Sequence, residues 1–303
     1  MNSRLLRFVA AVTVGISIFA LAGCASLVEK RVSAAVDNLS MAVQKQKDPE
    51  LVRDGAPAFL LVVDGVLEGD PDNERYLTGA AQIYSAYTSA FLVGKEPERA
   101  KILSDKARDY AIRAMEQRNP TFAALHDRPY SEFAPCLSTF TKDDVPALFL
   151  VVSTWATWIQ AHADDMNAIA DLAKVQSMTQ RLLELDDAYS YGSPHLYMGV
   201  LHTLIPAALG GRPEDGKKEF EAALRFGRGK FVMTYVLYAK QYARPALDRE
   251  LHDRLLTEAL AIPADVVPEL TLVNTLAQRE AKTLLDGSSD WFGEPMAEEG
   301  ETP

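Results

Sequence analysis

Few residues in this 303-residue chain have the types and spacing of a catalytic or ligand-binding motif. The nearest is the segment Gly211–Lys218, GRPEDGKK, which differs at its last position from the phosphate-binding pattern G-x-x-x-x-G-K-[S/T]. Lys218 stands where a serine or threonine must hold magnesium, Glu214 and Asp215 would repel a phosphate, and no strand precedes the segment. We therefore interpret it as a turn that leads into a helix.

The histidines and cysteines offer no stronger evidence for catalysis. His195 and His202 are seven residues apart and share one face of a helix, but no carboxylate follows in that helix and no H-E-x-x-H motif is present. We interpret both as core or pocket residues. Cys136 has neither a disulfide partner nor a catalytic base nearby in sequence and reads as a small buried residue. The sequence predicts no metal site, no cofactor and no enzymatic activity.

The N-terminus has the pattern of a bacterial lipoprotein signal. Arg4 and Arg7 precede an uncharged apolar run over residues 8–21, and Leu-Ala-Gly then leads directly into Cys24. The run is short for a membrane span, which needs about 20 residues. An uncleaved anchor helix, the alternative, does not explain the cysteine. We predict a signal peptide over 1–23, lipidation of Cys24 that anchors the chain to a membrane, and a tether over 24–46 in which the first helix begins.

The residue after Cys24 indicates the cellular location of the protein, and the charge of the mature chain limits the classes of partner that it can bind. Ala25 follows Cys24, where an aspartate would retain a lipoprotein in the inner membrane of a Gram-negative cell. The resemblance to lipoproteins therefore implies the periplasmic face of the outer membrane. Removal of residues 1–23 takes away two arginines and no acidic residue, so the net charge changes from -11 to -13. Nucleic acids need a basic surface, and we expect no nucleic-acid partner.

Helical signals dominate from Asp48 to Leu285, and strand signals are scarce. The predicted helix starts combine a capping side chain or a first-turn proline with nearby acidic residues; they lie at Asp48–Glu50, Asp70–Asp72, Asp144–Pro146, Ser193–Pro194 and Arg212–Glu214. Predicted stops lie at Gly94, at Gly210–Gly211 and at 227–229. The fold class is all-α, with one helical domain over 47–286.

Two pairs of predicted helices repeat one spacing of small and aromatic residues. The positions are Tyr84, Tyr87 and Phe91 followed by Ala100, Ser104 and Ala107, and then His195, Gly199 and His202 followed by Gly216, Phe220 and Ala223. Small residues at such positions let two helices approach closely while large ones fill the facing grooves. The spacing is similar to that of a tetratricopeptide (TPR) repeat but too degenerate for a regular array. We predict a TPR-like array of helical hairpins packed into one compact domain.

Two uncharged segments, 145–161 and 188–211, stand out in this acidic chain. A helix that is apolar on every face must be buried or lie in a membrane. Polar residues in the first segment, and prolines and a glycine in the second, argue against a membrane span. The segments form the central layer of the stack, or they wall an apolar cavity or channel, and both can hold. The candidate lining residues are Trp155, Trp158, Tyr189, Tyr191, His195 and Tyr197, with Tyr84 and Tyr87.

The C-terminal residues 287–303 are rich in glycine, proline and acidic side chains. Such a segment is too polar to form a core, and we predict a disordered acidic tail. Trp291 and Phe292 are unusual within it. They either pack locally against the body or form a motif that binds a partner.

A set of short segments in a fixed order connects the chain with a known family. The segments are Arg53–Phe59, Asp70–Asp72, Ala80–Tyr87, Ala107–Ala111, Lys142–Phe149, Trp155–Trp158, Leu185–Gly192, Ser193–His195, Leu209–Gly211 and Val236–Ala239. With these residues the chain resembles the TatT family, the TPR-like lipoprotein component of some tripartite ATP-independent periplasmic (TRAP) transport systems. The resemblance runs from about Asp48 to Leu285. Leu172-Ala173 departs from the expected Leu-Pro, which loosens one turn.

The resemblance implies an α-helical body, a homotrimer and a pore or cavity through each subunit. It implies a periplasmic TRAP solute-binding protein as partner and a hydrophobic or amphipathic ligand, such as a lipid or fatty acid. The expected function is that of a lipid-anchored accessory subunit that binds or channels this solute and docks the solute-binding protein. The alternative is a TPR-type interaction scaffold of the cell envelope without a small ligand. A hydrolase of envelope polymers lacks the carboxylate pair or nucleophile it needs.

Overall fold

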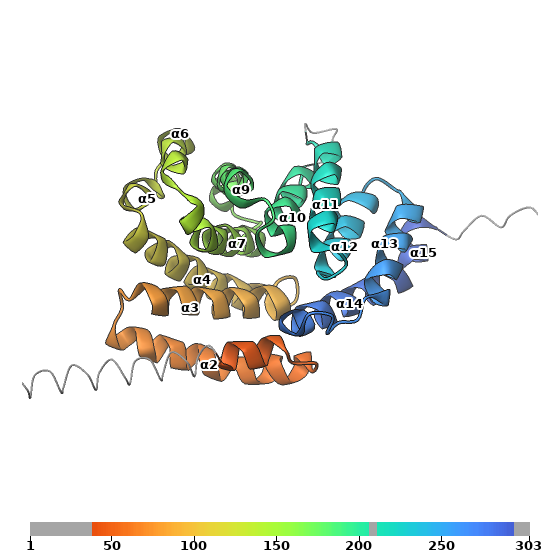
Figure 1. Ribbon diagram of the computed structural model, residues 1–303, viewed down its shortest axis with the longest axis horizontal. Coiled ribbons are helices and arrows are strands. Elements are labelled where there is room, and N and C mark those ends of the chain that lie inside the picture. The colour runs from red at the N-terminus through yellow and green to blue at the C-terminus, as the bar shows by residue number, and fades with distance from the viewer. Residues whose placement is uncertain (1–37, 206–210, 294–303) are drawn as a thin grey trace, which may run out of the picture.

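The computed structural model describes residues 38–205 and 211–293, and within these ranges all regular structure is helical (Figure 1). The predicted all-α fold class is confirmed. The predicted signal peptide, Cys24, most of the tether and the last ten residues of the tail lie outside the described residues. No helix in the described ranges is both long enough and apolar enough to cross a membrane.

The N-terminal half stacks its helices in the order of the sequence. Residues 38–44 are helical and precede α2. The elements that follow are α2 (Pro49–Gly69), α3 (Glu74–Tyr87), the π-helical turn η1 (Thr88–Leu92), α4 (Pro97–Arg118), α5 (Pro120–Leu125), α6 (Tyr130–Phe133), the 3-10 turns η2 (Ala134–Thr139) and η3 (Lys142–Asp144), α7 (Val145–Ala161), α8 (Met166–Ala170) and α9 (Leu172–Asp186). Figure 1 shows α2, α3 and α4 in successive layers with α7 and α9 above them.

The C-terminal half curves back toward the N-terminus. Its elements are α10 (Tyr189–Thr203), α11 (Pro213–Gly227), α12 (Met233–Tyr238), the π-helical turn η5 (Ala239–Ala243), α13 (Arg249–Ala261), the 3-10 turn η6 (Pro268–Leu270), α14 (Thr271–Asp286) and α15 (Ser288–Phe292). Helix α14 lies beside α2, and Arg279 of α14 forms an ion pair with Glu50 of α2 at 2.9 Å. The chain thus closes on itself through this ion pair and through Leu272 and Leu276 of α14, which pack against the core cluster that includes Val52 and Leu60 of α2.

Side-chain and proline signals set most of the helix starts as predicted. Asp48 accepts from the first backbone N–H groups of α2, and α7 and α11 begin with proline in the first turn. The start predicted at Asp70–Asp72 is wrong. Helix α3 begins at Glu74, because Asn73 accepts from the backbone N–H groups of Arg75 and Tyr76, while Asp70 accepts from the Asn73 amide. The amide of Asn73 takes the capping role that we assigned to a carboxylate.

The helix pairs predicted from small residues are the two most extensively packed pairs, α3 with α4 and α10 with α11. The approach of α10 to α11 is close enough to require glycine. A Cβ on Gly216 would lie 2.6 Å from Thr203 Cγ2 and 3.0 Å from the Gly199 carbonyl oxygen, and one on Gly199 would lie 3.0 Å from the Phe220 ring. The spacing of small residues in the sequence therefore reports a real contact between these helices.

The predicted disorder does not hold for the first residues of the tail. Ser288–Phe292 form the short helix α15, which packs against α13 and α14. The Trp291 ring lies 3.6 Å from the Arg244 guanidinium carbon, and Phe292 contacts His252 edge to face. Of the two interpretations of Trp291 and Phe292, this structure shows local packing. The contacts of the Trp291 and Phe292 rings with Arg244 and His252 compensate for the poor helix propensity of the segment.

A half-buried carboxylate joins the three N-terminal layers. Asp64 of α2 accepts hydrogen bonds from the hydroxyls of Tyr84 and Tyr110, both at 2.8 Å, and pairs with Lys106 at 2.6 Å. Burial alone would raise the pKa of Asp64, but these three donors outweigh it and lower the pKa below its ordinary value of 3.8. Asp64 therefore stabilises the fold in its charged form.

Replacement of Asp64 by asparagine is expected to lower the free energy of unfolding by roughly 1–3 kcal/mol at pH 7, because it removes a charged acceptor from three donors. Since folding lowers the pKa of Asp64, its contribution is present above pH 3.8 and is lost as the pH falls through the lower folded value. Urea unfolding at pH 7 and pH 3 tests this. Asp54→Asn, at an exposed carboxylate of the same helix, is the control. An equal Asp64 effect at both pH values would contradict the prediction.

Candidate functional site

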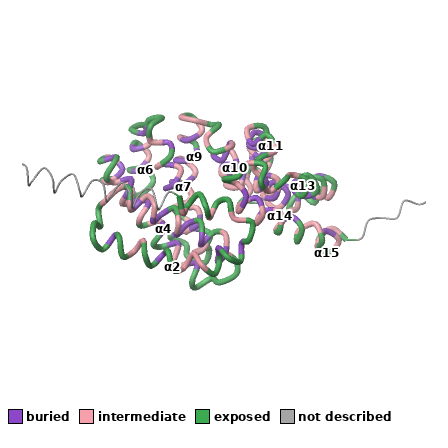
Figure 2. The backbone as a smooth tube through the Cα atoms, turned by 60° about the horizontal axis from the view of Figure 1, so that its bottom comes forward, coloured by how far each residue is buried: buried purple, intermediate pink, exposed green. Residues whose placement is uncertain are grey.

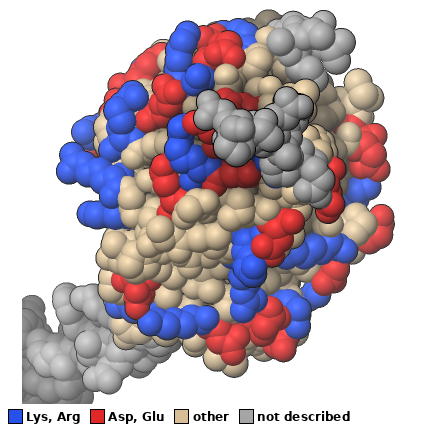
Figure 3. Space-filling view, turned by 90° about the vertical axis from the view of Figure 1, so that its right-hand side faces the viewer, with Lys and Arg blue, Asp and Glu red and all other residues tan. Residues whose placement is uncertain are grey.

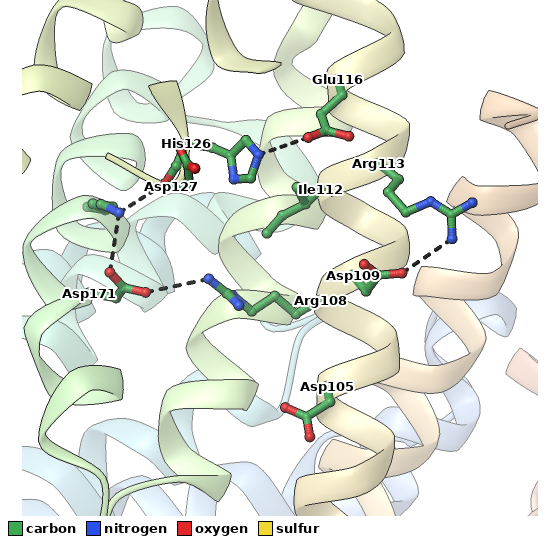
Figure 4. A pocket seen from close by; sticks show the side chains of 10 residues that line it. Asp105, Arg108, Asp109, Ile112, Arg113, Glu116, His126, Asp127 and Asp171 are labelled. Atoms are coloured by element: carbon green, nitrogen blue, oxygen red, sulfur yellow. Dashed lines mark hydrogen bonds and ion pairs between the residues drawn. The ribbon is translucent and has the colours of Figure 1, made fainter. Parts of the chain in front are cut away.

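An open cleft of about 540 Å³ lies between α4, the residues that follow α5, and the start of α9 (Figure 4). Its lining is almost entirely charged: Asp105, Arg108, Asp109, Ile112, Arg113, Glu116, His126, Asp127, Asp171 and Lys174. Helix α4 contributes its side chains at successive turns, and Asp171 precedes α9. The tryptophans of α7, one of the two uncharged segments, lie behind the base of this cleft.

Arg108 forms the base of the cleft. Its guanidinium carbon lies 4.3 Å from the ring centroid of Trp155 and 4.3 Å from that of Trp158. Its nearest carboxylate oxygen, on Asp171, is 3.5 Å away, longer than the usual 2.7–2.9 Å of a charge-assisted hydrogen bond. Burial lowers the pKa of Arg108 in spite of the neighbouring aspartates. The indoles hold this cation by cation–π contact rather than by hydrogen bonds.

Lys174 is the second cation at the base, with a side chain only 8% exposed. Its Nζ donates to the His126 carbonyl oxygen at 2.9 Å and lies 3.4 Å from Asp171. Asp171 also accepts from Trp155 Nε1 at 3.1 Å. The Lys174 Nζ lies 5.5 Å from the centroid of the Trp155 ring, whose other contacts include Arg108. Two partly desolvated cations thus share one carboxylate.

Acidic side chains surround this base (Figure 4). Asp105 accepts from Trp158 Nε1 at 2.7 Å, and among the described residues its one basic neighbour within ion-pair distance is His162, 3.5 Å away. Asp127 pairs with Arg128 at 3.7 Å. The remaining rim carboxylates are engaged more closely, Asp109 by Arg113 at 3.3 Å and Glu116 by His126 at 2.8 Å. The cleft is therefore positive at its base and acidic at its rim.

The aromatic residues predicted to line a cavity are distributed over several environments. Trp155 is fully buried in the largest core cluster, and Trp158 is half-buried beside Arg108. Tyr84 and Tyr87 are buried, and their hydroxyls donate to Asp64 and to the Arg53 carbonyl oxygen. Packing and hydrogen bonding account for Trp155, Tyr84 and Tyr87. That Trp158 lines a solute site stays a prediction.

The aromatics of α10 connect the two uncharged segments. Tyr189 and Tyr197 each contact Phe149 of α7 with ring centroids 5.4 Å apart. Burial raises the pKa of the Tyr197 hydroxyl to about 12. Of the eight candidate residues, only Tyr189 lines either the charged cleft or a second cleft within the described residues. That second cleft, of about 640 Å³, is lined by Asn73, Glu74, Arg75, Thr78, Gln82, Arg118, Asp143, Pro146, Ala147 and Tyr189.

Tyr191 and His195 lie at the junction of α10 with α11. Tyr191 belongs to a left-handed turn and stacks on Phe231, with ring centroids 6.4 Å apart. His195 Nδ1 lies 2.6 Å from Glu219 Oε2. His202 sits near the other end of α10, and burial together with Arg212 lowers its pKa. Within residues 38–205 and 211–293 no three His, Cys, Asp or Glu side chains are grouped so that they could hold a metal ion.

The residues that form the cleft were missed by sequence reasoning. Arg108 lies in α4, whereas Asp171 and Lys174 lie at the start of α9, and no spacing along the chain connects Arg108 with the other two. One signal was available. Arg108 follows Ala107, on the small-residue face of α4 that must contact a neighbouring helix, so a cation there needs an unusual partner.

The comparison with known families decides the identity. A family model of the TRAP transporter T-component (TAtT) matches residues 45–292. The chain belongs to this family. No curated protein matches the chain. As a T-component the protein works with other subunits of a TRAP transporter at the cell envelope. The charged cleft and both uncharged segments of the T-component lie within the matched residues.

Proposed function

We propose that this T-component is a lipid-anchored, non-enzymatic subunit that holds an amphipathic solute and docks a periplasmic TRAP solute-binding protein. The observation that carries the proposal is the base of the charged cleft, where a cation lies against two indoles. An amphipathic molecule has a polar end for such a cation and an apolar body for aromatic walls. The lipid anchor at Cys24 keeps the subunit at the outer membrane while it exchanges solute with the mobile binding protein.

The charge of the cleft supports an amphipathic solute over a purely apolar one. The rings of the two uncharged segments contact one another through Phe149, Tyr189 and Tyr197, and the cleft at Arg108 is open and lined almost entirely by charged side chains. A purely apolar molecule would remove the charged groups of the cleft from water without offering Arg108 an acceptor, which costs free energy. A solute with a polar end satisfies them.

Capture of the solute-binding protein tests the docking role. The mature chain is immobilised and exposed to an envelope extract of its own cell, and the retained proteins and small molecules are identified by mass spectrometry. Retention of a TRAP solute-binding protein supports the proposal. Retention of outer-membrane assembly factors without a solute-binding protein would overturn it and favour the scaffold function. Sedimentation of the purified mature chain in solution tests the homotrimer that the family resemblance implies.

Lipidation is tested separately by Cys24→Ser. This variant is expected to lose labelled fatty acid completely and to leave the membrane fraction, because the cysteine sulfur is the site of diacylglycerol attachment. Metabolic labelling with palmitate and fractionation of the envelope measure both effects. Cys136→Ser, at the buried cysteine, is the matched control and should retain label. Persistent label on Cys24→Ser would contradict the prediction.

One feature favours the scaffold function as a second candidate. Helix α2 is the outermost layer, and Figure 2, which brings this side of the molecule forward, shows much of the helix exposed. The helix carries an exposed, uncharged stripe. The α2 stripe consists of Leu51, Gly55, Ala58, Phe59, Val62, Gly65 and Val66, which fall within one third of the helix surface. Leu51 and Val62 are 59% and 60% exposed, and a Cβ on Gly55 or Gly65 would meet no atom within 4 Å. Another helix could approach this stripe closely.

A substitution in the α2 stripe separates docking from solute binding. Val62→Glu is expected to reduce the amount of captured protein partner at least tenfold. The amount of captured small molecules should stay unchanged. Met166→Glu, at a more exposed apolar residue of α8, is the control for added charge. Unchanged capture by Val62→Glu would exclude the α2 stripe as the docking surface.

Figure 3 shows the face around α13–α15, where acidic and basic side chains surround an uncharged area and form no continuous basic surface.

A further inference from the structure

The charged cleft carries an inference about the chemistry of the solute. We infer that it binds a zwitterionic group, with the anion at Arg108 and Lys174 and the cation among the rim carboxylates. The inference rests on the proposed function for its role in transport. Binding to the purified protein can nevertheless be measured without any docking partner.

Arg108 provides the first part of the argument. Its side chain is 26% exposed, so the guanidinium is open to the cleft, yet it donates no hydrogen bond to any side chain or carbonyl of residues 38–205 and 211–293. A guanidinium has five N–H donors in a planar fork that matches a carboxylate or phosphate. Its Nε is buried without a partner. A partly desolvated arginine without hydrogen bonds is costly, and an anion in the cleft would supply the acceptors.

The balance of charge at the base supports the same location for the anion. Arg108 and Lys174 together carry two positive charges, and Asp171 is the one carboxylate they share. Trp155 Nε1 donates to the same carboxylate. The base therefore keeps a net positive charge in a partly buried place, where electrostatic attraction to an anion is stronger than at the surface.

The rim argues against a simple anion. Counting every lining side chain, the cleft has more carboxylates than lysines and arginines. The Asp105 side chain is 59% exposed and has no lysine or arginine within ion-pair distance among the described residues, and the Asp127 side chain is 69% exposed and pairs with the exposed Arg128 at 3.7 Å. Their field would repel a ligand that carries only negative charge and attract a positive group. A ligand with only positive charge would leave the Arg108 guanidinium without a hydrogen-bond acceptor. A zwitterion meets both conditions.

Two sources offer this chemistry, namely a small free zwitterion and the headgroup of a zwitterionic lipid. Isothermal titration of the purified mature chain therefore uses glycine betaine, short-chain phosphatidylethanolamine, and phosphatidylglycerol with the same acyl chains as the anionic match. We expect at least one zwitterion to bind ten times or more as tightly as phosphatidylglycerol. Preference for betaine indicates a free solute, and preference for phosphatidylethanolamine indicates a headgroup.

Two substitutions distinguish the base from the rim. Arg108→Gln is expected to weaken zwitterion binding at least tenfold, whereas Arg99→Gln, at an exposed arginine of the same helix outside the cleft, should not change it. Asp105→Asn keeps an oxygen acceptor for Trp158 Nε1 at an exposed position, and it should weaken zwitterion binding while strengthening phosphatidylglycerol binding. If Arg108→Gln fails to fold, the opposite effects of Asp105→Asn on the two ligand classes still test the inference.

Several results would overturn the inference. Equal affinity for phosphatidylglycerol and both zwitterions would show an anion site only. Absence of saturable binding for all three probes would show that the cleft takes no such ligand. Neither result affects the capture of the solute-binding protein. The docking role and the zwitterion site can therefore be refuted separately.

Discussion

Replacement of Trp155 by alanine is expected to lower the free energy of unfolding by about 3–5 kcal/mol. The side chain is fully buried in the largest core cluster, so its removal leaves a cavity among close-packed neighbours. It also withdraws the ring that Arg108 and Lys174 contact, and the indole N–H that Asp171 accepts. Two cations would then lose an aromatic neighbour in a partly buried place. Urea unfolding followed by circular dichroism measures the loss.

Two further variants show which part of the indole matters. Trp291→Ala, at a residue 49% exposed and stacked on Arg244, should cost only about 1 kcal/mol. Trp155→Phe keeps an aromatic face for Arg108 and removes the hydrogen bond to Asp171, so it should cost less than Trp155→Ala. A Trp155→Ala variant as stable as Trp291→Ala would show that the core around α7 does not depend on this ring.

The second large effect is expected at Gly192, where alanine should cost roughly 2–5 kcal/mol. Gly192 has a φ of +78°, a left-handed conformation that disfavours a side chain. Its added Cβ would also lie 2.7 Å from Phe226 Cβ and 3.3 Å from Ala223 Cα, which belong to the body of α11 and cannot swing away. The substitution would push the start of α10 away from the end of α11. Thermal and urea unfolding give the size of the effect.

Gly94 is the matched control for the backbone part of this cost. It has a φ of +75°, and a Cβ there would meet no atom within 4 Å. Gly94→Ala should therefore cost only the left-handed conformation, about 1–2 kcal/mol. The difference between the two variants isolates the contact with α11. Equal losses for Gly94→Ala and Gly192→Ala would show that the helices tolerate the extra carbon.

The turn at Gly192 lies at the border between the two halves of the molecule. Ser190 and Tyr191 precede Gly192 in the same left-handed region, which is uncommon for residues with side chains. Ser193 Oγ donates to the Ser190 carbonyl oxygen at 2.6 Å, and right-handed helix resumes there. Helix α10 then faces both halves, with Tyr197 and Leu201 against the core of α7 and Leu196 in the core of α11–α14. The strained turn sets the direction of α10 so that its side chains pack in both cores.

Much of the fold follows from local patterns of the sequence alone. Capping side chains and first-turn prolines act within one helical turn, which is why the starts of α2, α7 and α11 could be predicted. Small residues at helical spacing predicted the α10–α11 contact, because only glycine permits that approach. The absence of charge over 145–161 predicted a central position, and α7 indeed forms the middle of the largest core cluster.

Tertiary structure alone decided the cleft and the direction of α10. Arg108 and Lys174 are ordinary surface residues by their local sequence, and they meet because α4 and α9 pack on opposite sides of the α7 tryptophans. A three-residue left-handed turn at Ser190–Gly192 is disfavoured locally and persists because the packing of α10 between two cores outweighs its strain. Local sequence determines which segments are helices, whereas desolvation and charge balance exist only once distant helices come together.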